Sequence, residues 1–268
     1  MRFAALAAAV IAATPVGYLQ GRQGSSGGFA EPGGRPSPQL TAWAVLGLRA
    51  AGAKPSPAAL DYLVAREDAL PSATDVELVA MAESVLGRRP ERLLARIRSV
   101  QRKTGQIGPR VNSTIWGVLA LRQAGEPPPR PAVRFILHRQ APSGGWSWFA
   151  GGSPDSNDTA AAVEALRAAG VRGVPIRRAL RYLRRLQNPD GGFELTPGRG
   201  SDSQSTAWAI QAFVAAGARV PAGSARYLQH MRRLDGSFRY SARYAATPVW
   251  VTSQVLPALA RRSFPLQH

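Results

Sequence analysis

The sequence predicts an all-α fold, an α/α toroid of about six helical hairpins with an apolar inner ring of helices and an Arg-rich outer ring. Three signals recur together along the 268 residues: a Pro opens each unit, a Thr stands near the start of its second half, and a Gly closes five of the six units. Successive Thr residues lie between 33 residues apart (Thr41 to Thr74) and 47 residues apart (Thr159 to Thr206). Repeats of this length are typical of stacked helix pairs, which bury a continuous core only when several pack together.

A predicted outer helix begins each unit at its Pro, because a residue without an N–H group is tolerated in the first turn of a helix. These residues are Pro15, Pro57, Pro90, Pro131, Pro175 and Pro221. Within residues 175–187, Ile176, Leu180 and Leu183 recur at helical spacing, and the Arg residues fall mostly on the opposite side. Such a helix buries one face and leaves an Arg-rich face in solvent.

A glycine-rich turn is predicted to link the two helices of most units. Paired Gly residues allow backbone angles that other residues resist, and the aromatic residue that follows can anchor the turn against the helix ends. The turns are Gly27-Gly28-Phe29, Gly144-Gly145-Trp146, Gly191-Gly192-Phe193 and, more loosely, Gly236-Ser237-Phe238 and Gly105-Gln106-Ile107-Gly108. The second unit, residues 57–87, lacks this turn and fits the repeat least well.

The inner helices are predicted from segments with few charges, such as residues 41–48 around Trp43 and residues 205–210 around Trp208. A helix that is apolar nearly all round is expected to be buried on both sides. Residues of the type preferred at helix N-caps stand near three of their starts. The expected N-caps are Ser113, Asp158 and Ser205. Six such pairs can close into a ring around a central cavity.

The composition excludes several classes of function. There is no Cys, so disulfides, thiolate nucleophiles and Cys-based metal sites are ruled out, and the three His show no metal-ligand spacing. The sequence therefore predicts no metal and no cofactor. The net charge is +18, but the Arg residues follow the solvated faces of helices, which disfavours a nucleic-acid partner. An anionic surface remains open as a partner.

The N-terminal segment has two interpretations. Arg2 followed by the apolar residues 3–13 resembles a short signal peptide, which predicts an exported or cell-surface protein. Alternatively, these residues extend the first outer helix, with Thr14 and Pro15 as its N-cap and first turn, and the protein is cytoplasmic. Residues 14–268 are expected to form a single toroid domain. No apolar run reaches the about 20 residues needed for a transmembrane helix.

Two turns carry a resemblance to a known superfamily. Residues 140–146 (Gln-Ala-Pro-Ser-Gly-Gly-Trp) and 187–193 (Gln-Asn-Pro-Asp-Gly-Gly-Phe) resemble the Q-x-x-x-G-x-W/F motif of squalene–hopene cyclases and protein prenyltransferase β-subunits. The resemblance implies the α/α toroid of that superfamily. It does not imply one activity, because the same fold hosts cyclases, zinc-dependent prenyltransferases and non-enzymatic cobalamin carriers.

The catalytic residues that the resemblance implies are incomplete. Residues 155–159 resemble the Asp-x-Asp-Asp-Thr segment of the cyclases, but Asn157 stands where the family has the proton-donating Asp. A carboxamide has no acidic proton to donate, so only Asp155 and Asp158 remain as weak candidate acids. The Asp/Cys/His zinc site of the prenyltransferases cannot form without Cys.

Amide and indole side chains recur at fixed positions around the repeat Thr. An amide stands two residues before it in four units, and a Trp two residues after it in three alternate units. Residues four apart share one face of a helix, so amide and indole are expected side by side at one end of the ring. An Asp stands four residues before the Thr in two units and adds charge near that end. The candidate ligand-binding residues are Gln39, Trp43, Asn112, Trp116, Asp155, Asn157, Asp158, Asp202, Gln204 and Trp208.

Four functions follow from these observations. The first is a non-catalytic binding module for an isoprenoid-like, amphipathic or glycan ligand, with a wide cavity that holds no cluster of carboxyl groups of raised pKa. The second is a terpenoid cyclase that uses Asp155 or Asp158 as its acid. The third is an (α/α)6-type carbohydrate enzyme, which needs two facing carboxylates from Glu31, Asp155, Asp158 and Asp202. The fourth is a structural or protein-interaction role for the Arg-rich exterior.

Overall fold

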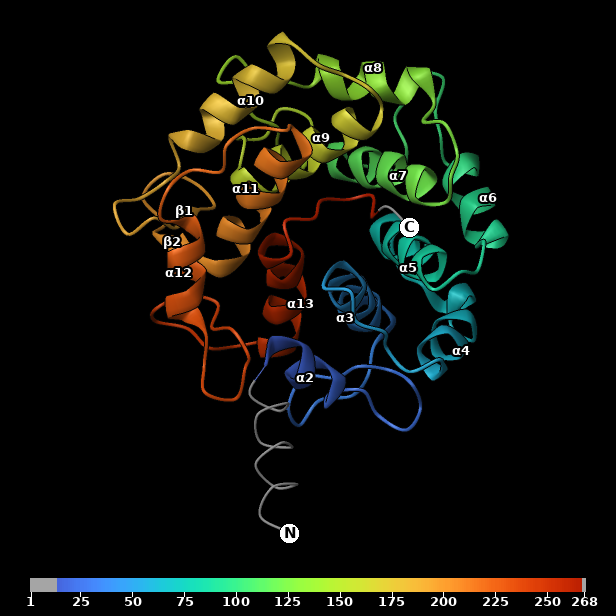
Figure 1. Cartoon of the computed structure of the whole chain (residues 1–268). Coiled ribbons are helices and arrows are strands. Elements are labelled where there is room, and N and C mark those ends of the chain that lie inside the picture. The colour runs from blue at the N-terminus through green and yellow to red at the C-terminus, as the bar shows by residue number, and fades with distance from the viewer. Residues whose placement is uncertain (1–13, 267–268) are drawn as a thin grey trace.

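In the computed structural model, which describes residues 14–266, outer and inner helices alternate along the chain and form a closed ring of six pairs (Figure 1). The outer helices are α2 (Pro15–Gln20), α4 (Ala58–Val64), α6 (Glu91–Ser99), α8 (Arg130–His138), α10 (Val174–Arg184) and α12 (Ser224–Met231). The inner helices are α3 (Pro38–Ala50), α5 (Ala73–Val85), α7 (Val111–Gln123), α9 (Ser156–Ala168), α11 (Ser203–Ala215) and α13 (Pro248–Leu259). The predicted α/α toroid is confirmed.

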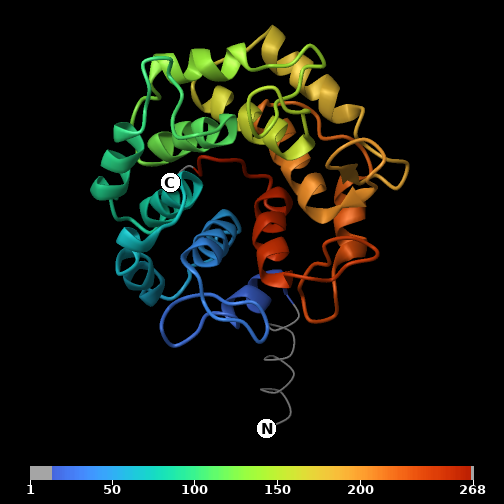
Figure 2. The same cartoon turned by 180° about the vertical axis from the view of Figure 1, so that it is seen from behind.

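Two short elements complete the described chain. The 3-10 helix η1 (Glu67–Ala69) lies between α4 and α5, where the second unit lacks the glycine turn. Strands β1 (Phe193–Glu194) and β2 (Ser201–Asp202) form a small antiparallel pair just before α11. The segment after α13 runs across the ring toward α5, as the view from behind also shows (Figure 2).

The two rings differ in burial as their patterns predict. Every residue of α3 from Leu40 to Leu48 is buried, because this helix has neighbours on both sides. In α10, by contrast, Ile176, Ala179, Leu180, Tyr182 and Leu183 are buried and the Arg residues between them are not. The inner ring is therefore apolar and the outer ring amphipathic.

The repeat Thr ties each glycine turn to its inner helix. The hydroxyl of Thr41 accepts a hydrogen bond of 2.9 Å from the backbone N–H of Phe29, and Thr159 and Thr206 accept equivalent bonds from Trp146 and Phe193. Thr114 and Thr252 do the same in their units. In the second unit, which has no such turn, the Thr74 hydroxyl donates to Asn112 instead. The Thr recurs because it satisfies a buried N–H of the turn.

In the units that begin the turn with Gln23, Gln140 and Gln187, this Gln and the first Gly of the turn join the unit to the next. Gly144 has a positive φ of 98°, and a Cβ there would lie 2.6 Å from the carbonyl oxygen of Arg178 in α10. The side chain of Gln140 donates to the carbonyls of Gly144 and Pro175, at 2.9 and 2.8 Å. The motif thus connects neighbouring outer helices, which explains why it recurs along the chain.

Three predicted N-caps are wrong. The N-caps of α9 and α11 are Asp155 and Asp202, whose side chains accept hydrogen bonds from the N–H groups of Asp158 and Ser205. Both helices begin three residues earlier than expected, because an Asp in extended conformation precedes each first turn. Ser113 likewise lies inside α7. The predicted cap of α2 at Thr14 is confirmed.

The ring closes where the first and last inner helices meet. Both carboxylate oxygens of Glu31 accept hydrogen bonds from the first turn of α13, from the N–H groups of Val249 and Trp250 at 2.9 and 2.8 Å. On α3, a Cβ at Gly47 would lie 2.5 Å from the carbonyl oxygen of Ser253 in α13. The two backbones approach this closely only because residue 47 has no side chain.

The N-terminal interpretations stay predictions, because residues 1–13 lie outside the described residues. Between residues 14 and 266, none of the helices combines the length and apolar character that crossing a membrane requires.

One carboxyl group is buried in the inner ring without a partner. Glu77 of α5 is fully buried against Gly117 of α7, and neither of its oxygens has a hydrogen-bond partner in the described part of the chain. Burial raises the pKa of Glu77 well above its ordinary value, and the charge of Asp75 raises it further. The side chain is therefore expected to be protonated at neutral pH.

Replacing Glu77 by Met is expected to raise the free energy of unfolding by about 1–3 kcal/mol at about pH 8, since a buried group without a partner is removed. The folded carboxyl keeps its proton at a pH where the unfolded one has lost it, so stability of the parent protein falls as the pH rises through this range. The gain should therefore shrink toward about pH 5. Urea unfolding of the parent and the variant at the two pH values measures this gain in the free energy of unfolding.

Glu83→Met is the matched control for this variant. Glu83 is also fully buried in α5, but it pairs with Arg88. Its replacement is expected to destabilise the protein, because the Arg88 guanidinium loses a partner. Equal effects of the two variants would contradict the assignment of Glu77 as an unpartnered acid.

Candidate functional site

Three indole rings meet at the centre of the toroid. Trp43, Trp116 and Trp208 come from the alternate inner helices α3, α7 and α11, and all three are buried. Their ring centroids are 5.5 Å (Trp43–Trp116), 6.0 Å (Trp43–Trp208) and 5.6 Å (Trp116–Trp208) apart, with interplanar angles of 85–88°. Edge-to-face pairs of this kind are favourable aromatic contacts. This indole triad closes the middle of the ring.

A small recess lies on the triad, at the end of the ring where the inner helices begin. Its volume is about 200 Å³. Amide side chains surround it and indole rings form much of its wall, and we name it the amide–indole recess. Its lining residues are Gln39, Trp43, Thr74, Leu78, Asn112, Trp116, Asn157, Asp158, Ala161, Gln204, Trp208, Trp250 and Gln254.

Most of the predicted ligand-binding residues come together here. The recess brings together Gln39, Trp43, Asn112, Trp116, Asn157, Asp158, Gln204 and Trp208. Asp155 and Asp202 do not line it, because each caps its helix from outside the first turn. The prediction of a wide cavity beside the amide and indole residues is wrong: the three indoles pack across the centre, and the recess at this end measures only about 200 Å³.

Sequence reasoning missed Trp250 and Gln254 of α13. These residues stand two before and two after Thr252, so the sixth unit carries the amide–indole pair in reversed order. A search for either residue type at either position would have found them. The indole N–H of Trp208 donates to Gln254 Oε1 at 2.8 Å.

Several polar groups of the recess have no partner. Gln254 is 1% exposed, and its Nε2 makes no hydrogen bond to any described residue. Within residues 14–266, no hydrogen bond engages the side chains of Gln39 and Gln204 or the indole N–H groups of Trp43 and Trp116. A buried amide donor without a partner is costly, so Gln254 is well placed to serve a bound acceptor.

Asp158 is the one carboxyl group of the recess among the described residues. Its Oδ1 accepts a hydrogen bond of 2.6 Å from Asn112 Nδ2. Burial raises the pKa of Asp158 well above its ordinary value, and the neighbouring charge of Asp155 raises it further. A protonated Asp158 leaves the recess electrically neutral.

Two further predicted site residues, Asn157 and Asp202, make hydrogen bonds to residues close in sequence. Asn157 accepts a hydrogen bond from the Ser156 hydroxyl at 3.2 Å, and its amide faces the recess. Asp202 lines a separate cavity of about 690 Å³ between the β1–β2 loop and α12. Burial raises the pKa of Asp202 to about 6, while bonds from Ser205 oppose this shift. In the stretch from residue 14 to residue 266, the His, Asp and Glu side chains form no group that could hold a metal ion.

This chain resembles known proteins in its structure and not detectably in its sequence. No protein-family model matches the sequence, and no curated protein is significantly similar to it. A solved protein from Actinoplanes has a TM-score of 0.71 and 19% identity, covering 95% of this chain and 99% of that one. The type II terpene cyclase MstE from Scytonema, in complex with geranylgeranyl dihydroxybenzoate, has a TM-score of 0.69 and 14% identity, covering 95% and 97%. This chain has the toroid fold of terpenoid cyclases.

Two further structures extend the toroid comparison. Candida albicans protein geranylgeranyltransferase-I has a TM-score of 0.63 and 12% identity, covering 83% of each chain. Haptocorrin in complex with Cbi has a TM-score of 0.56 and 13% identity, covering 93% of this chain and 66% of that one. At such identities the shared property is the toroid fold. The functions of these proteins do not transfer with it.

Replacing Trp116 by Ala is expected to lower the free energy of unfolding by about 3–5 kcal/mol, since it removes a buried ring from the centre of the triad. The exposed Trp148 is the matched control: its ring stacks under Arg110 on the surface, and its replacement should cost less than about 1 kcal/mol. Thermal or urea unfolding compares them. Similar losses for both would contradict the central role of the triad.

Proposed function

We propose that this protein is a non-catalytic binding module whose amide–indole recess takes one terminal ring of a neutral glycan. The observation that carries the proposal is the lining of the recess, which measures about 200 Å³: amides lie beside indole rings, and the buried Nε2 of Gln254 has no partner among the described residues.

The size of the recess favours a small ligand. Sites for drug-sized ligands measure roughly 300–1,000 Å³. The recess is smaller, and the indole triad blocks its extension into the ring. A long isoprenoid chain does not fit, whereas a single sugar ring is much smaller than such a ligand.

The chemistry of the lining favours a sugar. The amides of Gln39 and Gln204 each offer a donor and an acceptor, which is what a hydroxyl group needs, and Gln254 Nε2 offers a further donor. Indole rings offer apolar faces and edges for the C–H groups of a sugar ring. The lining has no free charge once Asp158 is protonated, so a neutral ligand matches it better than an anion.

Missing catalytic groups support binding without turnover. Asn157 occupies the position of the cyclase acid and has no proton to donate. Asp155 and Asp158 stand on one turn of α9, where Asp155 accepts a hydrogen bond from the N–H of Asp158. Glycoside hydrolysis requires two carboxyl groups on opposite sides of the scissile bond. An exported protein, which residues 1–13 suggest, would present this recess to cell-surface glycans.

Calorimetric titration with a panel of neutral mono- and oligosaccharides tests the proposal. At least one member is expected to bind, and Gln204→Leu and Gln39→Leu should each weaken that binding about tenfold, since each removes hydrogen bonds worth about 1.4 kcal/mol. Gln229→Leu, on the exposed side of α12, is the control and should bind as the parent does. Failure of the whole panel, or equal binding by all three variants, would contradict it.

A terpenoid cyclase is the second candidate, favoured by the raised pKa of Asp158 inside the recess. Such an acid could protonate an alkene if the substrate reached it. Incubation of the protein and its Asn157→Asp variant with geranylgeranyl dihydroxybenzoate, followed by mass spectrometry, tests this function. A cyclised product that disappears in Asp158→Asn would favour the cyclase over the binding module.

A further inference from the structure

The opposite end of the ring holds a larger cavity of about 830 Å³, where the inner helices end. The chain segment of residues 263–266 lies along this cavity and forms part of its lining. Four Arg side chains contribute to the wall, and we name it the Arg-lined groove. Its charged and amide residues are Arg88, Arg89, Arg122, Gln123, Glu164 and Arg167.

The groove holds the main chain of this segment through two buried side chains. Gln123 accepts a hydrogen bond from the N–H of Leu266 at 2.6 Å and donates one to its carbonyl at 2.9 Å. Glu164 accepts a hydrogen bond of 2.7 Å from the N–H of Phe264. The segment contributes only backbone groups to these three bonds, so they do not depend on the identity of its side chains.

One aromatic side chain anchors the segment. Phe264 is 2% exposed, and its ring lies under the indole triad with centroid distances of 6.4 Å to Trp43 and 6.1 Å to Trp208. The triad therefore has an occupied face on this side and the amide–indole recess on the other.

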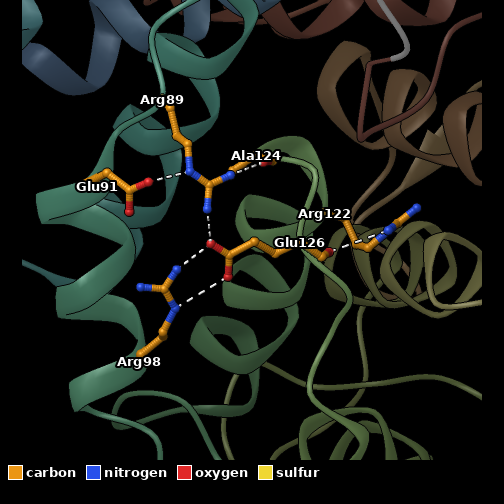
Figure 3. A network of polar contacts seen from close by, with 6 residues as sticks. All are labelled: Arg89, Glu91, Arg98, Arg122, Ala124 and Glu126. Carbon is orange, nitrogen blue, oxygen red and sulfur yellow. Dashed lines mark hydrogen bonds and ion pairs between the residues drawn. The ribbon is translucent and has the colours of Figure 1, made fainter.

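Two of the four arginines already have carboxylate partners. Arg88 pairs with Glu67 and Glu83. Arg89 pairs with Glu91 and Glu126, and Glu126 also binds Arg98 (Figure 3). These pairs compensate the charge of that part of the wall.

The other two arginines have no carboxylate partner among the described residues. Arg122 donates to the carbonyl of Glu126 (Figure 3), and its Nε has no hydrogen-bond partner in the described part. Arg167 donates to the carbonyls of Ala215 and Val171, both at 3.0 Å. The bound segment, residues 263–266, has no charged side chain, so it supplies no counter-charge to these two arginines. Carboxylates beside the anchor would fit this wall better.

We propose that the Arg-lined groove is a recognition site for an acidic peptide segment with an aromatic anchor, and that residues 263–266 are its exchangeable intramolecular occupant. This function is separate from the amide–indole recess, which opens at the other end of the ring. Only residues 260–262 join α13 to the bound segment, so the tethered occupant has a high effective concentration. A partner therefore has to bind tightly enough to displace this tethered segment.

Fluorescence anisotropy with labelled peptides tests the site on the full-length chain. The acidic probe Glu-Glu-Ser-Phe-Pro-Leu-Glu is expected to bind Phe264→Ala at least tenfold more tightly than it binds the parent, because the tethered competitor has lost its anchor. The basic probe Arg-Arg-Ser-Phe-Pro-Leu-Arg should bind Phe264→Ala at least tenfold more weakly than the acidic one. Phe149→Ala, which removes an exposed aromatic ring elsewhere, should behave as the parent.

Removing the charges of two arginines tests whether the acidic probe contacts the wall of the groove. In the Phe264→Ala background, the pair Arg122→Gln and Arg167→Gln should reduce the preference for the acidic probe to less than about threefold. The pair Arg177→Gln and Arg181→Gln on outer helix α10 is the matched control and should keep the preference. Equal affinity for both probes, or a preference that the Arg122 and Arg167 changes leave intact, would overturn the proposal.

Hydrogen exchange on the parent protein covers the case in which Phe264→Ala does not fold. The N–H groups of Phe264 and Leu266 are bonded to Glu164 and Gln123 and should exchange slowly. Saturating acidic probe is expected to speed both exchanges at least tenfold by displacing the segment, while the basic probe should leave them unchanged. If neither probe changes the exchange rates of these two N–H groups, residues 263–266 are not displaced and the proposal is overturned.

Discussion

Closure of the ring between α3 and α13 is the contact on which the other features depend. Gly47 allows the two helices to approach until backbone atoms of one reach the position of a side chain on the other. Glu31 fixes the start of α13 through two of its N–H groups. Without this contact the first and last hairpins would each expose an apolar inner helix. With it, every inner helix has two neighbours and their side chains converge on one axis.

The convergence of the inner-helix side chains on one axis explains why the centre of the ring is packed and why its two ends are separate. Trp43, Trp116 and Trp208 come from alternate helices, so only a closed ring brings all three within contact distance. Their packing separates the amide–indole recess at one end from the Arg-lined groove at the other. The toroid thus has a recess and a groove with different linings at its two ends, in place of one cavity that runs through the ring.

The sequence predicted the features that repeat and missed those that do not. The recurring Thr, Gly and Pro residues predicted the hairpins, and the amide and indole residues at fixed offsets predicted most of the recess. The cavity size was not predictable, because it depends on the ring radius at which three indoles meet. The bound position of Phe264 and Leu266 was also missed, since their partners Glu164 and Gln123 are 100 and 143 residues away. Asp155 and Asp202 were misassigned because local helix capping and site chemistry favour the same residue type.

Hydrogen exchange of a Gly47→Val variant tests ring closure most directly, because its side chain would clash with the backbone at Ser253. A closed ring predicts that protection falls to a similar extent in all described inner helices, including α7 and α9 on the far side, since the inner ring unfolds as one cooperative unit. Loss confined to α3 and α13, with unchanged protection in α7 and α9, would contradict the account and indicate an open array of independent hairpins.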